Sequence, residues 1–197
     1  MTQTSRLFVA ITLPETHQAI VGKSIGPLHQ TIPRNLVRWV PEQNLHLTLK
    51  FLGDTAESRI PKIQEALEDA VRSFQPFNTM IGRVGCFPNS KKPRVLWLSL
   101  DQQAQELQRL QKEVEYALGH LGFPHEKRPF SPHLTIGRVK RHVQQAQLAA
   151  IGDAVARSDI VNVANWQCDT VHLMKSRLSP QGAMYTSLSE HRLRTSN

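Results

Sequence analysis

The stretch Leu45-His46-Leu47-Thr48-Leu49 returns almost unchanged as Pro132-His133-Leu134-Thr135-Ile136. In a β-strand successive side chains point to opposite faces, so the histidine and threonine of each copy share one face and the aliphatic residues share the other. The two polar side chains would stand about 7 Å apart along the strand. Two such strands facing one cleft would supply two imidazoles and two hydroxyls, a set suited to acid–base chemistry on a phosphate.

The two copies fall at the same point of a repeated pattern. Strand-like runs open at Leu7 and Val95, which are 88 positions apart, and His133 follows His46 by 87 positions. Each half then predicts strand, helix, histidine strand, helix and strand. Outside the histidine strands the halves share little residue identity, so the architecture is what repeats. A third His-x-Thr, His29-Gln30-Thr31, ends a predicted helix before a proline and is interpreted as accidental.

Hydrophobic periodicity and the positions of proline and glycine predict the elements of both halves. In the first half we expect strands over 7–13, 46–53 and 77–87, helices over 14–30 and from a cap at Asp54 or Thr55 to about 74, and a loop over 33–41. In the second half we expect strands over 95–100, from 133 and over 165–178, helices over 101–120 and 143–157, a tight turn at 179–182 and a hairpin strand over 183–188.

These elements favour an α+β fold with antiparallel-rich sheets around a central cleft. We expect residues 1–197 to form a single domain of two lobes related by a pseudo-twofold axis, with architectural repeats at about 6–88 and 94–190. Either repeat alone would leave a sheet face open, so the two should pack as one unit. That packing would place His46 and His133 across a shared cleft.

The charge balance indicates the class of partner. Among 197 residues, 24 lysines and arginines oppose 16 acidic residues, which gives a net charge of +8 and a pI near 9.9. An excess of this size favours a polyanionic partner, nucleic acid first. Hydrophobic content of 40% and charged content of 20% are those of an ordinary globular protein.

Neither the cysteines nor any apolar run points to an exported or membrane protein. Cys86 and Cys168 are too few for a disulfide scaffold and form no Cys-x-x-Cys pair. The first residues do not resemble a signal peptide, and no run approaches the roughly 18 apolar residues of a membrane span. The default expectation is therefore a soluble, reduced, cytoplasmic protein without a membrane partner.

Two alternative interpretations of the paired motif do not use the histidines as a metal-free acid–base pair. In the simpler one, each is a half-buried strand whose histidine and threonine face solvent; the matched pair makes this a weak explanation. In the other, the histidines bind a catalytic metal. Two imidazoles with two hydroxyls are a poor ligand set, and no Asp, Glu or Cys stands beside them at ligand spacing. We therefore expect neither a metal nor a cofactor.

The paired motifs resemble those of the 2H phosphoesterases. Within that superfamily the resemblance is closest to the bacterial RNA 2′,3′-cyclic phosphodiesterases, also called 2′-5′ RNA ligases, and it covers nearly the whole chain. The opening strand at 6–11 and the first motif at 44–53 look like family features. So do Arg128-Pro129-Phe130 before the second motif and the closing segment from Ser176 to Tyr185.

The resemblance implies hydrolysis of an RNA 2′,3′-cyclic phosphate without a metal, leaving a 2′-phosphate. Opening a cyclic phosphodiester by water requires a base beside the water and an acid at the leaving oxygen, roughly in line. Residues alone do not say which histidine does which; the resemblance implies that His46 is the proton donor and His133 the proton acceptor. Thr48 and Thr135 would bind the phosphate through its nonbridging oxygens. Run backwards, the reaction would form a 2′-5′ linkage.

Five further residues are candidate substrate contacts. Arg128 and Arg138 flank the second motif and could hold RNA phosphates, or simply be solvated. Phe8, Trp39 and Phe130 could stack on a base, although a core role is the more common use of such side chains. Ser176 and Tyr185 are expected to support the closing hairpin.

Two rival functions remain open. One is a phosphodiesterase for a small cyclic phosphate, such as ADP-ribose 1″,2″-cyclic phosphate or a nucleoside 2′,3′-cyclic phosphate; the high positive charge favours RNA over it. The other is a non-catalytic RNA- or nucleotide-binding module on the same scaffold. The expected partner is RNA with a 2′,3′-cyclic phosphate end, and a monomer suffices because one chain carries both histidines.

Overall fold

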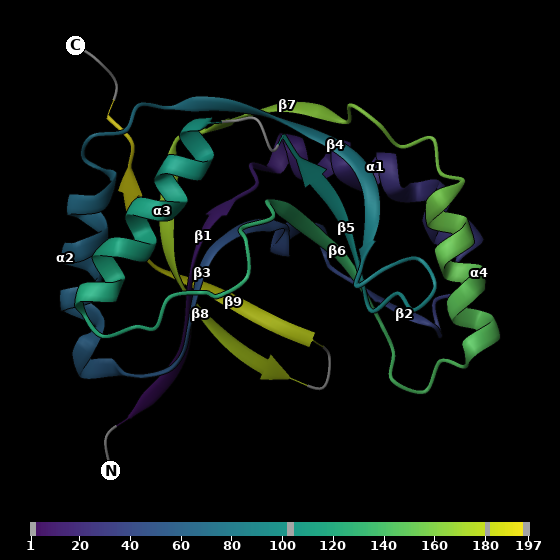
Figure 1. Cartoon of the computed structure of the whole chain (residues 1–197), viewed down its shortest axis with the longest axis horizontal. Helices are drawn as coiled ribbons and strands as arrows, with labels where there is room; N and C mark the ends of the chain where they lie inside the picture. The colour runs from purple at the N-terminus through teal and green to yellow at the C-terminus, as the bar shows by residue number, and fades with distance from the viewer. Residues whose placement is uncertain (1–2, 102–104, 180–181, 195–197) are drawn as a thin grey trace.

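The two histidine strands meet at the middle of one nine-stranded antiparallel sheet in the computed structural model, which describes residues 3–101, 105–179 and 182–194 (Figure 1). The strand order is β7-β4-β5-β6-β3-β1-β8-β9, with β2 pairing to β6. β3 and β6 are joined through one pair, Leu47 opposite Leu134. The sheet therefore consists of two halves that diverge from this contact.

The half on the β3 side is called here the β3 lobe. Its strands, from the centre outward, are β3 (His46–Ala56), β1 (Thr4–Thr12), β8 (Thr170–Ser179) and β9 (Gly182–Arg192). Two helices lie against it, α2 (Ile60–Val71) after the 3-10 turn η2 (Glu57–Arg59), and α3 (Gln105–His120) (Figure 1).

The half on the β6 side is the β6 lobe. Its strands, from the centre outward, are β6 (His133–Val139), β5 (Val95–Leu100), β4 (Phe77–Phe87) and β7 (Ala164–Cys168), with β2 (Val37–Trp39) beside β6. Helices α1 (Glu15–Thr31) and α4 (Gln145–Ala156) lie against it, and the 3-10 turn η1 (Glu42–Asn44) leads into β3.

The predicted α+β architecture of two pseudo-twofold lobes is confirmed. In each lobe the histidine strand is innermost and the opening strand of the same sequence half is second. Three outer strands, however, come from the other half of the sequence: β4 lies in the β6 lobe, and β8 and β9 lie in the β3 lobe, whereas β7 lies in the lobe of its own half. The two sequence repeats are therefore interlocked, and no cut in the chain separates one lobe from the other.

Several boundaries differ from those predicted. The segment 165–178 is two strands, because the chain leaves the β6 lobe after Cys168 and enters the β3 lobe at Thr170. Asp54 and Thr55 do not cap a helix, since β1 extends to Thr4 and the β1–β3 ladder continues past them. The predicted loop 33–41 contains β2, which pairs with β6.

The remaining predicted elements are present with small shifts of their ends. The first helix runs over Glu15–Thr31 and the last over Gln145–Ala156, and the strand Phe77–Phe87 has the predicted bounds. The hairpin partner spans Gly182–Arg192. Two predicted details, the turn residues 180–181 and residues 102–104 of the helix expected over 101–120, lie outside the described residues.

One hydrophobic core runs beneath both lobes. It includes the aliphatic residues that alternate with the motif side chains: Leu45, Leu47, Leu49, Leu134 and Ile136 are all at most 3% exposed. Burying each such side chain stabilises the fold by roughly 1.5–3 kcal/mol. A slip of one residue in either histidine strand would exchange these side chains with the polar ones, so burial fixes which face carries the histidines.

Candidate active site

The histidines and threonines of both motifs share the sheet face opposite the core. Leu47 and Leu134 are directly paired and buried, so the residues on either side of them turn to the other face. Because the strands are antiparallel, this register sets Thr135 beside His46 and His133 beside Thr48. The pairing thus gathers the four predicted site residues into one group, each histidine next to the threonine of the other motif.

Both imidazoles are anchored in the same way. His46 Nδ1 lies 2.7 Å from the carbonyl oxygen of Asn44, and His133 Nδ1 lies 2.7 Å from that of Ser131. A carbonyl oxygen only accepts hydrogen bonds, so Nδ1 must carry the proton in each ring. The remaining nitrogen, Nε2, is then the one that gains or loses a proton. Each ring presents a base when neutral and an acid when protonated.

Aromatic rings form a wall beside each imidazole. The His46 ring centroid lies 5.1 Å from that of Phe8 and 5.1 Å from that of Tyr185. The His133 centroid lies 5.1 Å from that of Phe87 and 6.5 Å from that of Trp97. The Tyr185 and Phe87 contacts are edge-to-face and the other two are tilted, and together they restrict the ring orientation. The hydrogen bond at Nδ1 and the aromatic wall together hold each Nε2 in a fixed direction.

The environment lowers the pKa of both histidines. Burial is the main cause for each, because a charged imidazole is poorly solvated among these rings. The hydrogen bond to the carbonyl oxygen acts in the opposite direction, and the positive charge of Arg138 lowers both pKa values further. His133 also lowers the pKa of His46, which indicates that the two rings interact electrostatically.

A bulge in β6 brings Arg138 to this face. Trp97 pairs with Thr135 and Leu96 pairs with Gly137, so Ile136 is an extra residue in the ladder. Beyond the bulge the alternation is shifted by one, and the exposed Arg138 follows the buried Gly137. Of the two predicted arginine contacts, Arg138 is therefore placed beside the histidines.

Arg128 is in a different situation. It lies in the loop before β6, with its side chain 86% exposed, and its guanidinium donates to both carboxylate oxygens of Glu126 at 3.2 Å. These hydrogen bonds, with one from the Arg128 backbone, lower the pKa of Glu126 to about 2. Much of the charge of Arg128 is therefore already balanced by its neighbour.

The three predicted aromatic contacts have different surroundings. Phe8 forms the wall of His46 and is only 3% exposed, so it contacts the ring without offering an open stacking surface. Trp39 packs on His29 of α1 with ring centroids 4.2 Å apart, and Phe130 packs against the main core. These placements favour packing roles for Trp39 and Phe130.

Sequence reasoning missed several residues of this face. Phe87 and Trp97 build the wall of His133, and no motif marks them. His172 of β8 is a third histidine here, since it pairs with Ala10, which itself pairs with Thr48. Its ring nitrogens lie within hydrogen-bonding distance of the Thr12 and Ser187 hydroxyls, at 3.1 and 3.2 Å. Only the sheet register could have revealed these neighbours.

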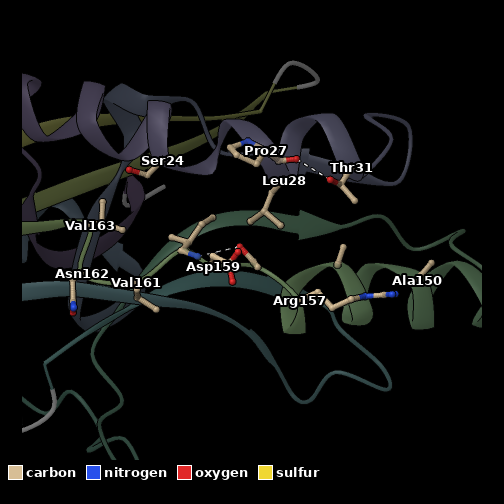
Figure 2. A pocket seen from close by; sticks show the side chains of 13 residues that line it. Ser24, Pro27, Leu28, Thr31, Ala150, Arg157, Asp159, Val161, Asn162 and Val163 are labelled. Carbon is tan, nitrogen blue, oxygen red and sulfur yellow. Dashed lines mark hydrogen bonds between the residues drawn. The ribbon is translucent and has the colours of Figure 1, made fainter.

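A hollow of about 740 Å³ lies elsewhere, between α1, α4 and the segment 157–163 (Figure 2). Thr31 beside it donates to the carbonyl oxygen of Pro27 at 2.9 Å, a bond within α1. None of the predicted site residues lines this hollow. Across the described residues, no helix combines the length and apolar character that a membrane crossing requires. The same residues contain no group of three or more His, Cys, Asp or Glu side chains placed to hold a metal ion.

Comparisons with known proteins agree with this geometry. A model of the 2′-5′ RNA ligase superfamily matches residues 18–179. An RNA 2′,3′-cyclic phosphodiesterase of Methanothermobacter thermautotrophicus is 32% identical over 188 residues, covering 95% of this chain and 98% of the relative. The protein of that name from Thermotoga maritima is 35% identical over 193 residues, covering 94% of each chain.

Solved structures give the same result for the fold. The protein TT0787 of Thermus thermophilus superposes with a TM-score of 0.80 at 27% identity, covering 98% of this chain and 100% of that one. Escherichia coli LigT complexed with 3′-AMP superposes with a TM-score of 0.76 at 24% identity, with the same coverage. The family predicted from the paired motifs is confirmed: the chain belongs to the 2′-5′ RNA ligase superfamily of 2H phosphoesterases.

Proposed function

We propose that this protein hydrolyses 2′,3′-cyclic phosphodiester ends of RNA to 2′-phosphomonoesters, with His46 and His133 as the acid–base pair and without a metal ion. The observation that carries the proposal is the matched anchoring of the two imidazoles. Each donates Nδ1–H to a backbone carbonyl 2.7 Å away, on adjacent strands and on one face. Two imidazoles held in this way can serve opposite sides of one phosphorus atom.

The proton transfers then balance within the pair. Neutral His133 accepts a proton at Nε2 from the attacking water as the water oxygen bonds to phosphorus. The bond between phosphorus and the 3′-oxygen breaks, and protonated His46 gives its Nε2 proton to that oxygen. The product carries a 2′-phosphate and a 3′-hydroxyl. Attack by a 5′-hydroxyl on the cyclic phosphate in place of water would form a 2′-5′ linkage, which makes ligation a side reaction of the same site.

The threonines and Arg138 supply the electrostatic part. Thr48 and Thr135 stand beside the opposite histidines, where their hydroxyls can donate to the nonbridging oxygens. Arg138 adds a fixed positive charge close to both rings. A preorganised set of donors of this kind stabilises the charge that develops on the phosphoryl group.

RNA is the proposed substrate for two reasons. The net charge of +8 favours a polyanion over a small phosphate, and the relatives of about a third identity carry the name RNA 2′,3′-cyclic phosphodiesterase. One chain contributes both histidines, so a monomer is sufficient for the reaction.

The test is hydrolysis of an oligoribonucleotide that ends in a 2′,3′-cyclic phosphate, measured with EDTA present. His46→Ala and His133→Ala should each lower kcat/KM by about 10²–10⁴. His142→Ala, which removes an exposed histidine just beyond β6, is the matched control and should turn over as the parent does.

Each contrary result has its own meaning. Near-full activity of either alanine variant rejects the two-histidine mechanism. Activity that EDTA abolishes indicates a metal enzyme. Tight RNA binding without turnover indicates a binding module, and faster turnover of a mononucleoside cyclic phosphate than of the oligonucleotide indicates a small-molecule enzyme.

A further inference from the structure

The β2–β6 ladder sets two arginines directly opposite each other. Arg38 pairs with Arg138, between the buried pair Val37–Val139 and the pair of Trp39 with Gly137. Both arginines are exposed. Directly paired residues of antiparallel strands share a face, so Arg38 lies on the same face as Arg138, which is the face of the histidines.

The position of β2 places Arg38 along the contact between the lobes. β6 is paired with β5 along one edge. Along its other edge it pairs first with β3, at Leu134, and then with β2, from Gly137 onward. β2 therefore continues the edge that β3 leaves, and Arg38 extends the line of polar residues outward from the histidines. Adjacent strands are about 4.8 Å apart, so the two arginine side chains leave the sheet side by side.

This arrangement has an electrostatic cost that the described residues do not offset. Like charges directly opposite each other in a sheet are destabilising. Neither guanidinium has a carboxylate within ion-pair distance in the part of the chain that the structure describes. In contrast, Arg72, Arg109 and Arg128 each pair with an acidic residue close in sequence. An anion bound between the two groups would relieve this repulsion.

We propose that Arg38 forms a second phosphate subsite beside Arg138, which binds the internucleotide phosphodiester next to the reacting cyclic phosphate, with Arg138 between the two phosphates. The inference rests on the proposed function and adds to it that the enzyme selects polymer ends over mononucleotides. Guanidinium groups match phosphate oxygens with two parallel hydrogen bonds. A nucleoside 2′,3′-cyclic phosphate has no phosphate to place there, whereas every RNA end of two or more nucleotides has one.

Arg38 is the sharper probe of the subsite, because Arg138 also acts on the pKa of both histidines. The experiment compares kcat/KM for a cyclic-phosphate-ended trinucleotide with kcat/KM for the mononucleoside cyclic phosphate. Arg38→Gln should lower the ratio of the two about tenfold, the size expected for loss of a charge-assisted hydrogen bond. The matched control is Arg83→Gln, which removes an exposed arginine of the same lobe beside α4.

Binding without turnover gives an independent measurement. For an uncleavable oligonucleotide with a 3′-phosphate end, Arg38→Gln should weaken binding and reduce the slope of log K against log salt by about 0.7, the value for one phosphate contact on a single strand. Arg38→Lys keeps the charge and should lie between the parent and the glutamine variant. An unchanged ratio together with an unchanged salt slope overturns the subsite.

The two proposals fail in different ways. If the parent protein shows no cyclic phosphodiesterase activity, the proposed function is rejected, while the binding measurement still decides whether Arg38 contacts RNA. An active parent whose Arg38→Gln variant keeps the same selectivity rejects the subsite alone. If Arg83→Gln lowers the ratio as much as Arg38→Gln does, general attraction to positive charge explains the selectivity and the subsite is also rejected.

Discussion

Five positions after its histidine, the β3 lobe carries Phe51 and the β6 lobe carries Arg138. Both side chains follow a bulge and both are exposed; Phe51 is 68% exposed and lies 6.3 Å from Phe8, the ring beside His46. The acid–base part of the two lobes is duplicated, with the same carbonyl anchor at Nδ1. Their flanks differ, so the four motif side chains form a symmetric group whose neighbouring residues are asymmetric.

The lobes also differ in the contacts of the residue that precedes Phe51 or Arg138 and faces the interior. In the β3 lobe Lys50 turns into the interior, where its Nζ donates to Glu115 Oε2 at 2.6 Å and to the Pro124 carbonyl oxygen at 2.8 Å. At the equivalent place in the β6 lobe is Gly137, on which a Cβ would lie within 3.1 Å of Val37 and Trp39 atoms. An ion pair supports one histidine strand, and close packing of β2 supports the other.

The largest effect should come from replacing each histidine in turn, and the two variants should differ in how kcat/KM depends on pH. In the proposed mechanism the base, His133, must be neutral, so kcat/KM should fall as the pH drops below its pKa. The proposed acid, His46, must be protonated, so kcat/KM should fall as the pH rises above its pKa. Burial lowers both pKa values, which centres the bell on the acid side of an ordinary histidine. Beside an overall loss of about 10²–10⁴, His46→Ala should lose the alkaline limb and His133→Ala the acid limb. Stopped assays of kcat/KM across pH measure this.

A bell-shaped profile that persists in either alanine variant would show that another group titrates in its place. His172 is then the first candidate, as the third histidine on this face. The double variant His46→Ala with His172→Ala separates the two, because removing the substitute acid should flatten the remaining limb.

The next effect concerns the two ways of supporting the strands. Lys50→Met leaves Glu115 without its main partner in a site where the lysine side chain is 2% exposed. Removing one member of such a buried pair destabilises the fold by about 3 kcal/mol, a fall in Tm of about 6–12 °C for a chain of this size. Thermal unfolding followed by circular dichroism measures it. Lys175→Met, which breaks a partly exposed pair with Glu57, should lower the Tm much less.

If the Lys50 and Lys175 variants lose equal stability, the buried pair contributes no more than a surface one. The double variant Lys50→Met with Glu115→Leu provides a further check. Replacing both charges by apolar groups should recover much of the loss, since no unpaired carboxylate remains.

These contrasts show which features the sequence could predict. The histidine-threonine spacing and the alternating leucines are local, and local periodicity was enough to place both motifs on strands with the polar face outward. The pairing of Arg38 with Arg138 was not predictable, because β2 has three residues and its partner lies 100 positions further along the chain. The ion pair of Lys50 was hidden for the opposite reason: in sequence it is one more polar residue on a strand, and only the bulge turns it inward.

The aromatic walls teach the same lesson about position. His46 contacts Phe8 of β1 and Tyr185 of β9, whereas His133 contacts Phe87 of β4 and Trp97 of β5. The rings do not occupy matching places in the two repeats, so no comparison of the halves would have found them. Tyr185 and Phe87 reach the histidines from strands of the other half of the chain, whereas Phe8 and Trp97 lie on the opening strand of the same half.

A smaller effect should follow from the charge that only the β6 lobe carries. The positive charge of Arg138 lowers the pKa of both histidines, so Arg138→Gln should raise both and move the whole bell toward higher pH. The direction of this shift is independent of any change in substrate affinity, because kcat/KM reports the pKa values of the free enzyme. Arg38→Gln is the comparison variant. NMR titration of the two histidines should show a clear rise of their pKa values in Arg138→Gln relative to Arg38→Gln. A shift toward lower pH would contradict the placement of Arg138.

The smallest effects should distinguish the two aromatic walls. Tyr185→Phe keeps the ring that meets His46 and removes only a hydroxyl, so kcat should change by less than about threefold. Tyr185→Leu removes the edge-to-face contact, worth about 0.5–1.5 kcal/mol, and should lower kcat about two- to tenfold through a less constrained imidazole. Phe87→Leu is the matched change at His133. Equal losses for the two leucine variants would mean that acid and base need the same degree of orientation. A loss confined to one of them would show that the duplicated anchor at Nδ1 is sufficient for the other ring.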